Sequence, residues 1–530
     1  MGEVSITPPA SLEKSPDQPT RLTNRLSRNV LFSLARVAVN SLVALVLPAY
    51  LTHHLPVATY SAWVLILQLG AFVSFLDFGI QTGVAKFVAE YEARGDDLGA
   101  GRYASAGLVM MSLTGLLGVA LTLVLAWQVP RLFHNMPANL YQDVRLSVLL
   151  VGVSLSVGLV CSVFSSVFLG LQRYAVPMGI AILSKMAFTV AVLSAAFLHS
   201  NLAVMGAAVA FVNLATGALQ VLAWRQMSSP IRVSFALADS LVLKQMSRYC
   251  ILLAIWIVGM VCVNGLDVTI VGHYSYDQTA YYSIASLPVS FLLLIISSVL
   301  GPMMPASSAL STQRSAAEMG TILACTTRYS TLLLFLTGLP LIVCGLPILR
   351  LWVGPLYAVH SLNYLRILVV ANIIRNLCAP YATMITATGQ LGAATAAPVC
   401  EAVLNLGSSI YLANHFGAMG VAIGTMLGAF LSISLHFVVS MRYSRQKLAI
   451  LRSRFFMSSM LRPAITALPS VLLLPIWLSS SQKALTPSMT MLWGLSTFLL
   501  AWFVGLNRDE RNSLVRMTRS RLLPIFGLVN

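Results

Sequence analysis

The sequence predicts an all-α membrane protein with about fourteen transmembrane helices. Apolar residues make up 58% of the 530-residue chain and charged residues only 9%. So few charges could not cover the surface of a water-soluble protein of this size. Apolar runs of about 17–25 residues, long enough to cross a bilayer, recur along most of the chain and are separated by charge, Gly or Pro.

The fourteen predicted spans fall into a first group of six, a second group of six and a final pair. The first six lie near 30–51, 58–83, 104–127, 146–170, 176–198 and 202–225. The next six lie near 248–272, 280–303, 329–351, 363–387, 392–414 and 419–441, and the last two near 462–480 and 488–506. Pro340 and Pro380 interrupt the ninth and tenth spans, whose boundaries are therefore the least defined.

Composition and motifs argue against several other classes of protein. The seven cysteines are an odd number and form no CxxC pair, so we expect neither disulfides nor a zinc site. The chain lacks a GxxxxGK[ST] phosphate loop and an HExxH metal site, and its longest predicted outer loop, 128–145, is too short for a catalytic domain. We therefore predict a transporter without a cofactor rather than an enzyme, with H⁺ or Na⁺ as candidate coupling ions.

The distribution of positive charge predicts the orientation in the membrane. The net charge is +17, but the basic residues lie between apolar spans, a topology signal rather than a nucleic-acid site. With both termini inside, 25 of the 33 Lys and Arg residues lie in inner loops and tails, including Arg328, and four lie in outer loops. Both termini are therefore predicted to be cytoplasmic, which makes the first apolar run a retained span rather than a signal peptide.

A weak internal repeat divides the chain into two lobes. Thr59-Tyr-Ser-Ala-Trp is similar to Thr279-Ala-Tyr-Tyr-Ser, and Ala203-Val-Met-Gly-Ala-Ala to Gly417-Ala-Met-Gly-Val-Ala. Each repeat holds six spans, so both enter the membrane from the same side and enclose a cavity between them. The predicted divisions are an N-terminal tail (1–29), an N-lobe (30–225), an amphipathic linker (226–247), a C-lobe (248–441), a basic loop (442–461), spans thirteen and fourteen (462–506) and a basic tail (507–530). The linker and the tail are either membrane-surface helices or solvated segments.

Charged residues inside predicted spans are the candidate functional groups, because each needs a partner or a wet cavity. Lys185 and Glu401 lie near mid-membrane at equivalent repeat positions, and Asn405 shares a helix face with Glu401. Arg375 lies at similar depth and shares a face with Asn372. We expect these residues to line a substrate cavity, with buried helix-locking pairs as the alternative.

Three further charges lie nearer the membrane surfaces. Arg36 and Asp77 are at similar depth on consecutive antiparallel spans, so we expect a structural ion pair, with a gate or ligand contact as the alternative. Asp267 lies near the outer end of its span and is either a gate residue or an interfacial one. Arg36, with Lys185 and Arg375, is also a basic residue that could bind an anion.

Several segments resemble one known family. Asn40 with Leu47-Pro48 and Tyr60-Ser-Ala-Trp63, then Phe75-Leu-Asp77-Phe-Gly79, resembles the opening of the polysaccharide-transporter family. Asn264-Gly-Leu-Asp267, and Glu401 with Phe416-Gly-Ala-Met-Gly420, are similar to later segments of the same family. These transporters belong to the multidrug/oligosaccharidyl-lipid/polysaccharide exporter superfamily, and the likeness extends over essentially the whole chain through diffuse motifs.

The resemblance implies a flippase for undecaprenyl-diphosphate-linked oligosaccharide that works by alternating access in the bacterial inner membrane. It implies lipid-linked glycan, membrane lipids, and polysaccharide polymerase or assembly proteins as partners, in O-antigen or exopolysaccharide biosynthesis. Two relatives in the superfamily are the alternatives. A cation-coupled multidrug antiporter would use Asp77, Asp267 and Glu401 as ion sites, whereas a lipid II flippase would also use a cationic cavity.

Overall fold

The computed structural model is helical throughout the part of the chain that it describes. The described residues are 18–226, 231–311, 314–388, 391–443, 448, 450–473 and 486–522, and no strand occurs among them. Thirteen helical segments within these ranges are long and apolar enough to cross a membrane. The eleventh predicted span, 392–414, is occupied by one further helix of 26 residues. Parts of the predicted N-terminal tail, basic loop, thirteenth span and C-terminal tail lie outside the described residues.

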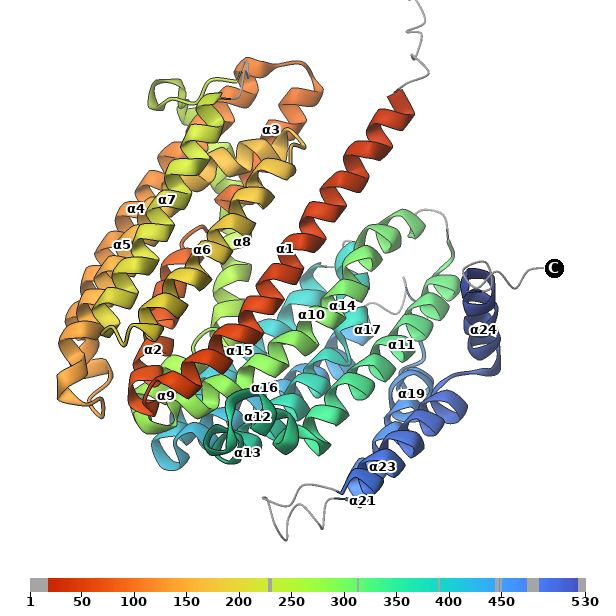
Figure 1. The fold of residues 1–530 in the computed structure, drawn as a ribbon. Helices are drawn as coiled ribbons and strands as arrows, with labels where there is room; N and C mark the ends of the chain where they lie inside the picture. The colour runs from red at the N-terminus through yellow and green to blue at the C-terminus, as the bar shows by residue number, and fades with distance from the viewer. Residues whose placement is uncertain are drawn as a thin grey trace, which may run out of the picture.

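Among the described residues, seven helices form the first half of the molecule. Figure 1 shows their arrangement. They are α1 (Gln18–His54), α2 (Val57–Phe75), α3 (Ile80–Ala93), α4 (Asp97–Leu132), α5 (Tyr141–Gly170), α6 (Ala175–Phe197) and α7 (Leu202–Gln226). The predicted second span is broken between α2 and α3, where Phe78 and Gly79 have φ values of 45° and 76°. Asp77 Oδ1 accepts the backbone N–H of Gln81 at 3.1 Å and so caps the start of α3.

Nine helices form the second half. They are α8 (Ser240–Asn264), α9 (Asp267–Tyr274), α10 (Thr279–Leu310), α11 (Ala316–Val343), α12 (Gly345–Val353), α13 (Pro355–Asn376), α14 (Ala379–Ala387), α15 (Leu391–Phe416) and α16 (Ala418–Leu435). The prediction that the ninth span starts at 329 is wrong. A capping box between Ser315 and Glu318 starts α11 at Ala316, and Arg328, counted as a loop charge, lies buried within that helix.

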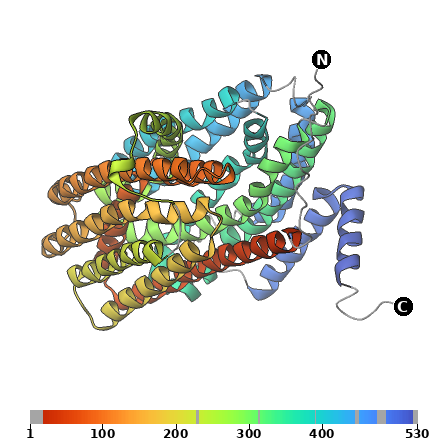
Figure 2. The ribbon, with the colours of Figure 1, turned by 90° about the horizontal axis from the view of Figure 1, so that it is seen from above.

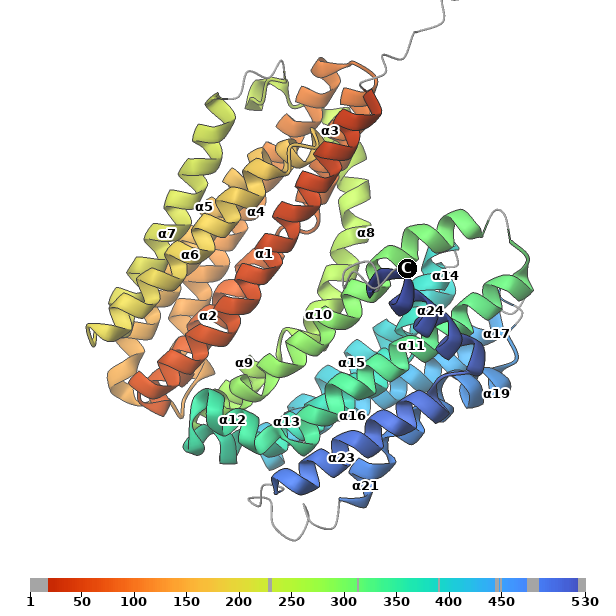
Figure 3. The same cartoon turned by 45° about the vertical axis from the view of Figure 1, so that its right-hand side comes forward.

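The C-terminal helices pack beside the second half, along α11 (Figures 2 and 3). They include α19 (Arg452–Phe455), α20 (Arg462–Ala464), α21 (Leu468–Leu472), α23 (Pro487–Leu500) and α24 (Arg508–Leu522), with the π-helical turns η5 (Phe456–Leu461) and η7 (Ala501–Gly505). Arg328 Nη1 forms a salt bridge with Glu510 Oε1 at 2.5 Å, and Arg328 Nε donates to the Ser458 carbonyl at 3.0 Å. One buried guanidinium therefore joins α11 to both η5 and α24.

The two halves meet at one end and diverge at the other (Figures 1 and 3). At the closed end, near α9 and α12, a single hydrophobic cluster contains residues of both halves, among them Leu65, Phe133, Val271 and Leu349. At the end where α1 begins, one cluster belongs to α3, α4, α5 and the start of α8, and a separate one to α10, α11, α14 and the helices that follow α16. Within these described clusters, the two halves are thus joined at that end only through the start of α8, whose Met246 and Cys250 pack into the first cluster, whereas at the closed end they share one extended core.

Hydrogen bonds between the halves accompany this shared core. The set, called here the seam, comprises Gln68 Nε2 to the Gly265 carbonyl (2.6 Å), Tyr276 OH to the Ala58 carbonyl (2.7 Å), Ala280 N–H to Ser61 Oγ (3.2 Å), Trp352 Nε1 to the Leu45 carbonyl (2.7 Å) and His273 Nδ1 to the Leu132 carbonyl (2.6 Å). The backbone of α9 also lies close to a side chain of the first half, because a Cβ at Gly272 would lie 2.7 Å from Leu65 Cδ2. This end of the molecule is therefore tightly closed.

Glycines at matching positions of the internal repeat allow close helix packing in both halves. A Cβ on Gly206 of α7 would lie 2.7 Å from Ser147 of α5, and one on Gly420 of α16 would lie 2.1 Å from the Leu412 carbonyl of α15. The partner helices differ, because α5 lies two helices before α7 whereas α15 directly precedes α16. The small-residue matches in the sequence thus correspond to close helix contacts.

The described part of the linker packs onto the first half. Ile231 is buried in the cluster formed by α3, α4 and α5, and the Ser234 N–H donates to Ser105 Oγ at 3.1 Å. Asp239 then caps α8 by accepting the Leu241 N–H. Ile231 is therefore covered by protein, whereas Phe235 and Leu241 of the predicted linker are exposed.

Candidate functional site

A polar cavity lies within the first half of the molecule. It has a volume of about 570 Å³ and is lined by residues of α1, α2, α3, α5, α6 and α7. Its polar lining consists of Arg36, Asn40, Gln81, Ser162, Ser165, Ser184, Lys185, Asn213, Thr216 and Gln220. The cavity, called here the N-half pocket, combines cations, amides and hydroxyls.

Two cations determine the charge of the N-half pocket. Arg36 is exposed, and its Nη1 contacts Met178 Sδ at 3.4 Å. Lys185 is half-buried, with Nζ 4.8 Å from the centre of the Phe188 ring. No carboxylate is among the lining residues, and none of the four salt bridges within the described ranges involves either cation. The pocket is therefore positively charged and suited to an anion.

Helix α7 contributes a polar stripe to the N-half pocket. Asn213, Thr216 and Gln220 recur at three- and four-residue spacing, which places them on one helix face. Thr216 Oγ1 donates to Ser184 Oγ at 2.7 Å, and Asn213 Nδ2 donates to Ser154 Oγ at 3.0 Å. Charge within a predicted span does not identify this stripe, because its side chains are neutral.

The second half holds a separate network of buried charges. Arg375 of α13 forms an ion pair through Nε with Glu401 of α15, and its Nη1 contacts Asn372 Oδ1 at 3.4 Å. The two ion-paired side chains are only 12% and 6% exposed. Such a pair is stable in an apolar setting only while both partners remain. Arg375 and Glu401 thus connect α13 to α15.

Asp267 and Asn405 extend this network toward α8 and α9. Asp267 Oδ2 accepts hydrogen bonds from Tyr282 OH at 3.1 Å and from Thr425 Oγ1 at 3.2 Å, within the electrostatic influence of Arg375. Asn405 is fully buried; its Nδ2 donates to the Val263 carbonyl at 2.7 Å. These contacts fix the junction of α8 and α9 to α10, α15 and α16.

The structure separates the predicted site residues into two groups. Arg36 and Lys185 line the N-half pocket, whereas Arg375 and Glu401 are not among its lining residues. The contacts of Arg375, Glu401, Asn372 and Asn405 match the alternative of buried helix-locking groups.

The predicted ion pair between Arg36 and Asp77 is wrong. The Asp77 carboxylate caps α3 at the break after α2, and Arg36 contacts Met178 of α6 instead. The sequence showed two charges at similar depth on consecutive helices. It did not show that α1 packs chiefly against α6 rather than α2.

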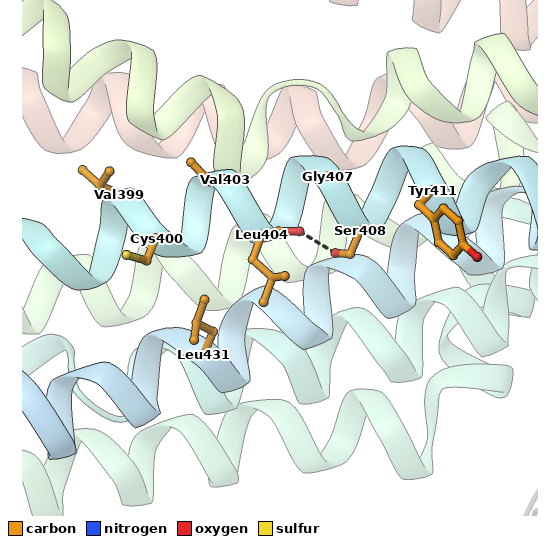
Figure 4. A pocket seen from close by; sticks show the side chains of 8 residues that line it. All are labelled: Val399, Cys400, Val403, Leu404, Gly407, Ser408, Tyr411 and Leu431. Carbon is orange, nitrogen blue, oxygen red and sulfur yellow. Dashed lines mark hydrogen bonds between the residues drawn. The ribbon is translucent and has the colours of Figure 1, made fainter.

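A second cavity is an apolar groove on the surface of α15 and α16. Its volume is about 540 Å³. It is lined by Val399, Cys400, Val403, Leu404, Gly407, Ser408, Tyr411 and Leu431 (Figure 4). The hydroxyl of Ser408 donates to the Leu404 carbonyl at 2.6 Å, so it adds little polarity. The groove offers apolar contact and no charge, and it cannot recognise an ionic headgroup.

Comparison with solved structures defines the fold. The lipid II flippase MurJ in an inward closed conformation superposes with a TM-score of 0.63 at 13% identity, over 93% of this chain and 100% of that one. An inward-facing multidrug resistance MATE family transporter of the MOP superfamily gives 0.62 at 14% identity, over 78% and 95%. A MOP superfamily transporter from Pyrococcus furiosus gives 0.53 at 14%, over 81% and 97%.

This chain has the fold of the MOP superfamily transporters. No protein-family model and no curated protein matches it, so the likeness is one of structure. With its thirteen candidate spans, the chain is a multi-pass integral membrane protein. Within the MOP fold, the N-half pocket belongs to the first half and the buried ion network to the second.

Proposed function

We propose that the protein is a flippase that carries an undecaprenyl-diphosphate-linked oligosaccharide across the bacterial cytoplasmic membrane by alternating access. The observation that supports this proposal most is the positive N-half pocket. The diphosphate between lipid and sugar must leave water to cross the membrane, and an anion in a medium of low dielectric constant needs compensating charge. Arg36 offers a bidentate contact and Lys185 a compact charge.

The neutral polar groups of the pocket support a glycan as the rest of the headgroup. Asn40, Gln81 and Gln220 present amides, which can donate and accept hydrogen bonds with sugar hydroxyls. Ser and Thr hydroxyls supply further partners. A pocket of about 570 Å³ has room for the diphosphate and its adjoining sugar, while the polyprenyl chain stays in the lipid.

The fold comparisons support a flippase more than a multidrug antiporter. The MurJ likeness extends over 93% of the chain, whereas the inward-facing MATE likeness extends over 78%. An antiporter would use Asp267 and Glu401 as ion sites, but here the Arg375 guanidinium already neutralises Glu401. A lipid II flippase remains the alternative that makes the same use of the N-half pocket, because its substrate also carries a lipid-linked diphosphate.

The proposal includes a cellular setting. The loop charge bias predicts cytoplasmic termini, and the substrate class implies the inner membrane and a role in polysaccharide or O-antigen assembly. Polysaccharide polymerase and assembly proteins are the proposed partners, and H⁺ or Na⁺ is the proposed coupling ion.

Reconstitution tests the proposal. Full-length protein in liposomes is given a fluorescent undecaprenyl-diphosphate-linked oligosaccharide, and its transfer between leaflets is followed by quenching. We expect Arg36→Gln with Lys185→Gln to lower the rate at low substrate by about tenfold or more, because each removes a hydrogen bond to a charged group. The matched control Arg102→Gln removes an exposed cation of α4 outside the pocket and should transfer normally.

Three results would contradict the proposal. The double variant might transfer substrate as fast as the wild type, which would remove the pocket from the mechanism. Preferential transfer of lipid II would establish the lipid II alternative. Transport of cationic drugs without transfer of either lipid would establish the antiporter.

A further inference from the structure

Two histidines face each other across the seam, one from each half of the molecule. His134 follows the end of α4 in the first half, and His273 belongs to α9 in the second. Their ring centres are 5.4 Å apart with an interplanar angle of 80°. His134 is exposed and His273 is half-buried. Protons from the surrounding water can therefore reach a contact that spans the closed end.

The hydrogen bond of His273 defines where a proton would bind. Its Nδ1 lies 2.6 Å from the Leu132 carbonyl, and a carbonyl only accepts, so Nδ1 carries the hydrogen. In a neutral imidazole the other ring nitrogen, Nε2, is then the unprotonated one. Imidazole is the side chain whose charge changes near neutral pH, and a proton taken up by His273 would bind at Nε2.

Few other groups near this contact could compensate for those charges. Four of the elements packed against α9 carry titratable side chains, and α16 carries none. These side chains are Tyr60 on α2, Tyr281 and Tyr282 on α10, Tyr276 and Asp277 in the turn after α9, and Cys400, Glu401, Tyr411 and His415 on α15. On the side of His134, Arg131 lies on Trp127, and α5 begins with Tyr141, Asp143 and Arg145. Asp267 and Tyr274 share α9 with His273.

The nearby carboxylates do not pair with either histidine. Glu401 is bound to Arg375, and Asp267 accepts from Tyr282 and Thr425. No salt bridge joins His134 or His273 to a carboxylate in the described part of the chain. Protonation of both rings therefore places two like charges at a 5.4 Å ring separation across the seam.

We propose that the His134–His273 contact is a pH-sensitive latch of the closed end, which mild acid on that side of the membrane releases. In neutral solution the uncharged rings pack together and His273 holds the end of α4. In acid the two imidazolium groups repel, and the halves separate where the seam joins them. The inference concerns the movement of the halves and is independent of the transported substrate.

Distance measurements between spin labels test the latch. The full-length chain, with its seven native cysteines replaced, is labelled at Asn201→Cys in the first half and Leu351→Cys in the second, both exposed at the closed end. In lipid nanodiscs we expect a short distance at pH 7.5 and a growing long-distance population toward pH 5.5. The ratio of the two should change by up to about tenfold per pH unit for each proton taken up on opening.

Variants separate the latch from other titrating groups. His273→Asn places an amide donor near Nδ1 and cannot titrate, so together with His134→Asn it should abolish the pH response. His134→Lys carries a permanent charge and should raise the open population already at pH 7.5. His199→Gln, a matched change of an exposed histidine between α6 and α7, should respond like the parent. A pH response that persists in the double Asn variant, or is absent in the parent, would overturn the proposal.

Discussion

The buried pair between Arg328 and Glu510 gives the most direct test of how the C-terminal helices are held. Glu510→Gln keeps the size of the side chain and removes its charge. The two side chains are 8% and 11% exposed, so solvent screens their interaction little. Leaving one partner of such a pair buried and unpaired costs about 3–5 kcal/mol. The glutamine carbonyl still accepts one hydrogen bond, so we expect a cost of about 3 kcal/mol, at the low end of that range.

The expected effect is local, because the carboxylate holds the start of α24. Glu510 Oε2 also accepts the Asn507 N–H at 2.8 Å. A loss of about 3 kcal/mol should speed amide hydrogen exchange in α24 by roughly a hundredfold or more, as each 1.4 kcal/mol is a factor of ten. Mass spectrometry of peptides from residues 507–522 measures this exchange in the full-length protein in nanodiscs.

Two further variants complete the test. Asp509→Asn removes the neighbouring carboxylate, which is exposed and has no salt bridge within the described ranges, and exchange in α24 should then stay at the wild-type rate. Arg328→Met with Glu510→Met removes both charges and should restore much of the protection. If Glu510→Gln exchanged no faster than Asp509→Asn, the assignment of the pair as the fastener of α24 would be refuted.

Three other predictions concern pH and packing. Burial acts to raise the pKa of Glu510, but hydrogen bonds from Arg328 and the Asn507 backbone outweigh it and hold the pKa below its ordinary value. Docking of α24 should therefore be complete at neutral pH and weaken as pH falls below the ordinary glutamate range. Amide hydrogen exchange in α24, measured at a series of pH values, would show this. Glu401→Gln should lower the thermal stability of purified protein, by an amount that corresponds to about 3 kcal/mol, and adding Arg375→Met should recover part of it; equal stability of the single variant and the wild type would contradict the buried-pair assignment. Gly272→Ala puts a methyl group 2.7 Å from Leu65 and should open the closed end in the spin-label assay, whereas Gly494→Ala, where a Cβ meets nothing within 4 Å, should not.

The sequence predicted the spans better than their ends. Hydropathy located them because a bilayer core requires about 20 apolar residues, whatever the neighbouring helices are. The start of α11 was missed because a polar first turn, set by the Ser315 capping box, extends the helix beyond its apolar run. The break after α2 was missed because it depends on the backbone of Phe78 and Gly79 and on the close approach of Leu253.

The candidate site was predicted in part. Lys185 and Arg36 were predicted because a charge within a membrane span is costly unless it has a partner or lines a wet cavity. Their pocket neighbours Asn213 and Gln220 carry no charge and so gave little signal. The pairing of Arg375 with Glu401 depends on α13 and α15 lying together, a tertiary contact that depth along each helix does not reveal. The position of a residue along its helix gives its depth in the membrane. It does not show which neighbouring helix the side chain faces.

The distribution of hydrophobic clusters also makes one end of the molecule easier to open than the other. Separating the halves at the α9 end would expose one continuous apolar core to water, whereas at the opposite end the cluster of the first half reaches the second half only through α8. Without substrate, the protein should therefore rest with its halves apart at the end where α1 begins. The opposite conformation would expose more apolar surface to water. Under the proposed function, the energy source would then act on the step that opens the α9 end.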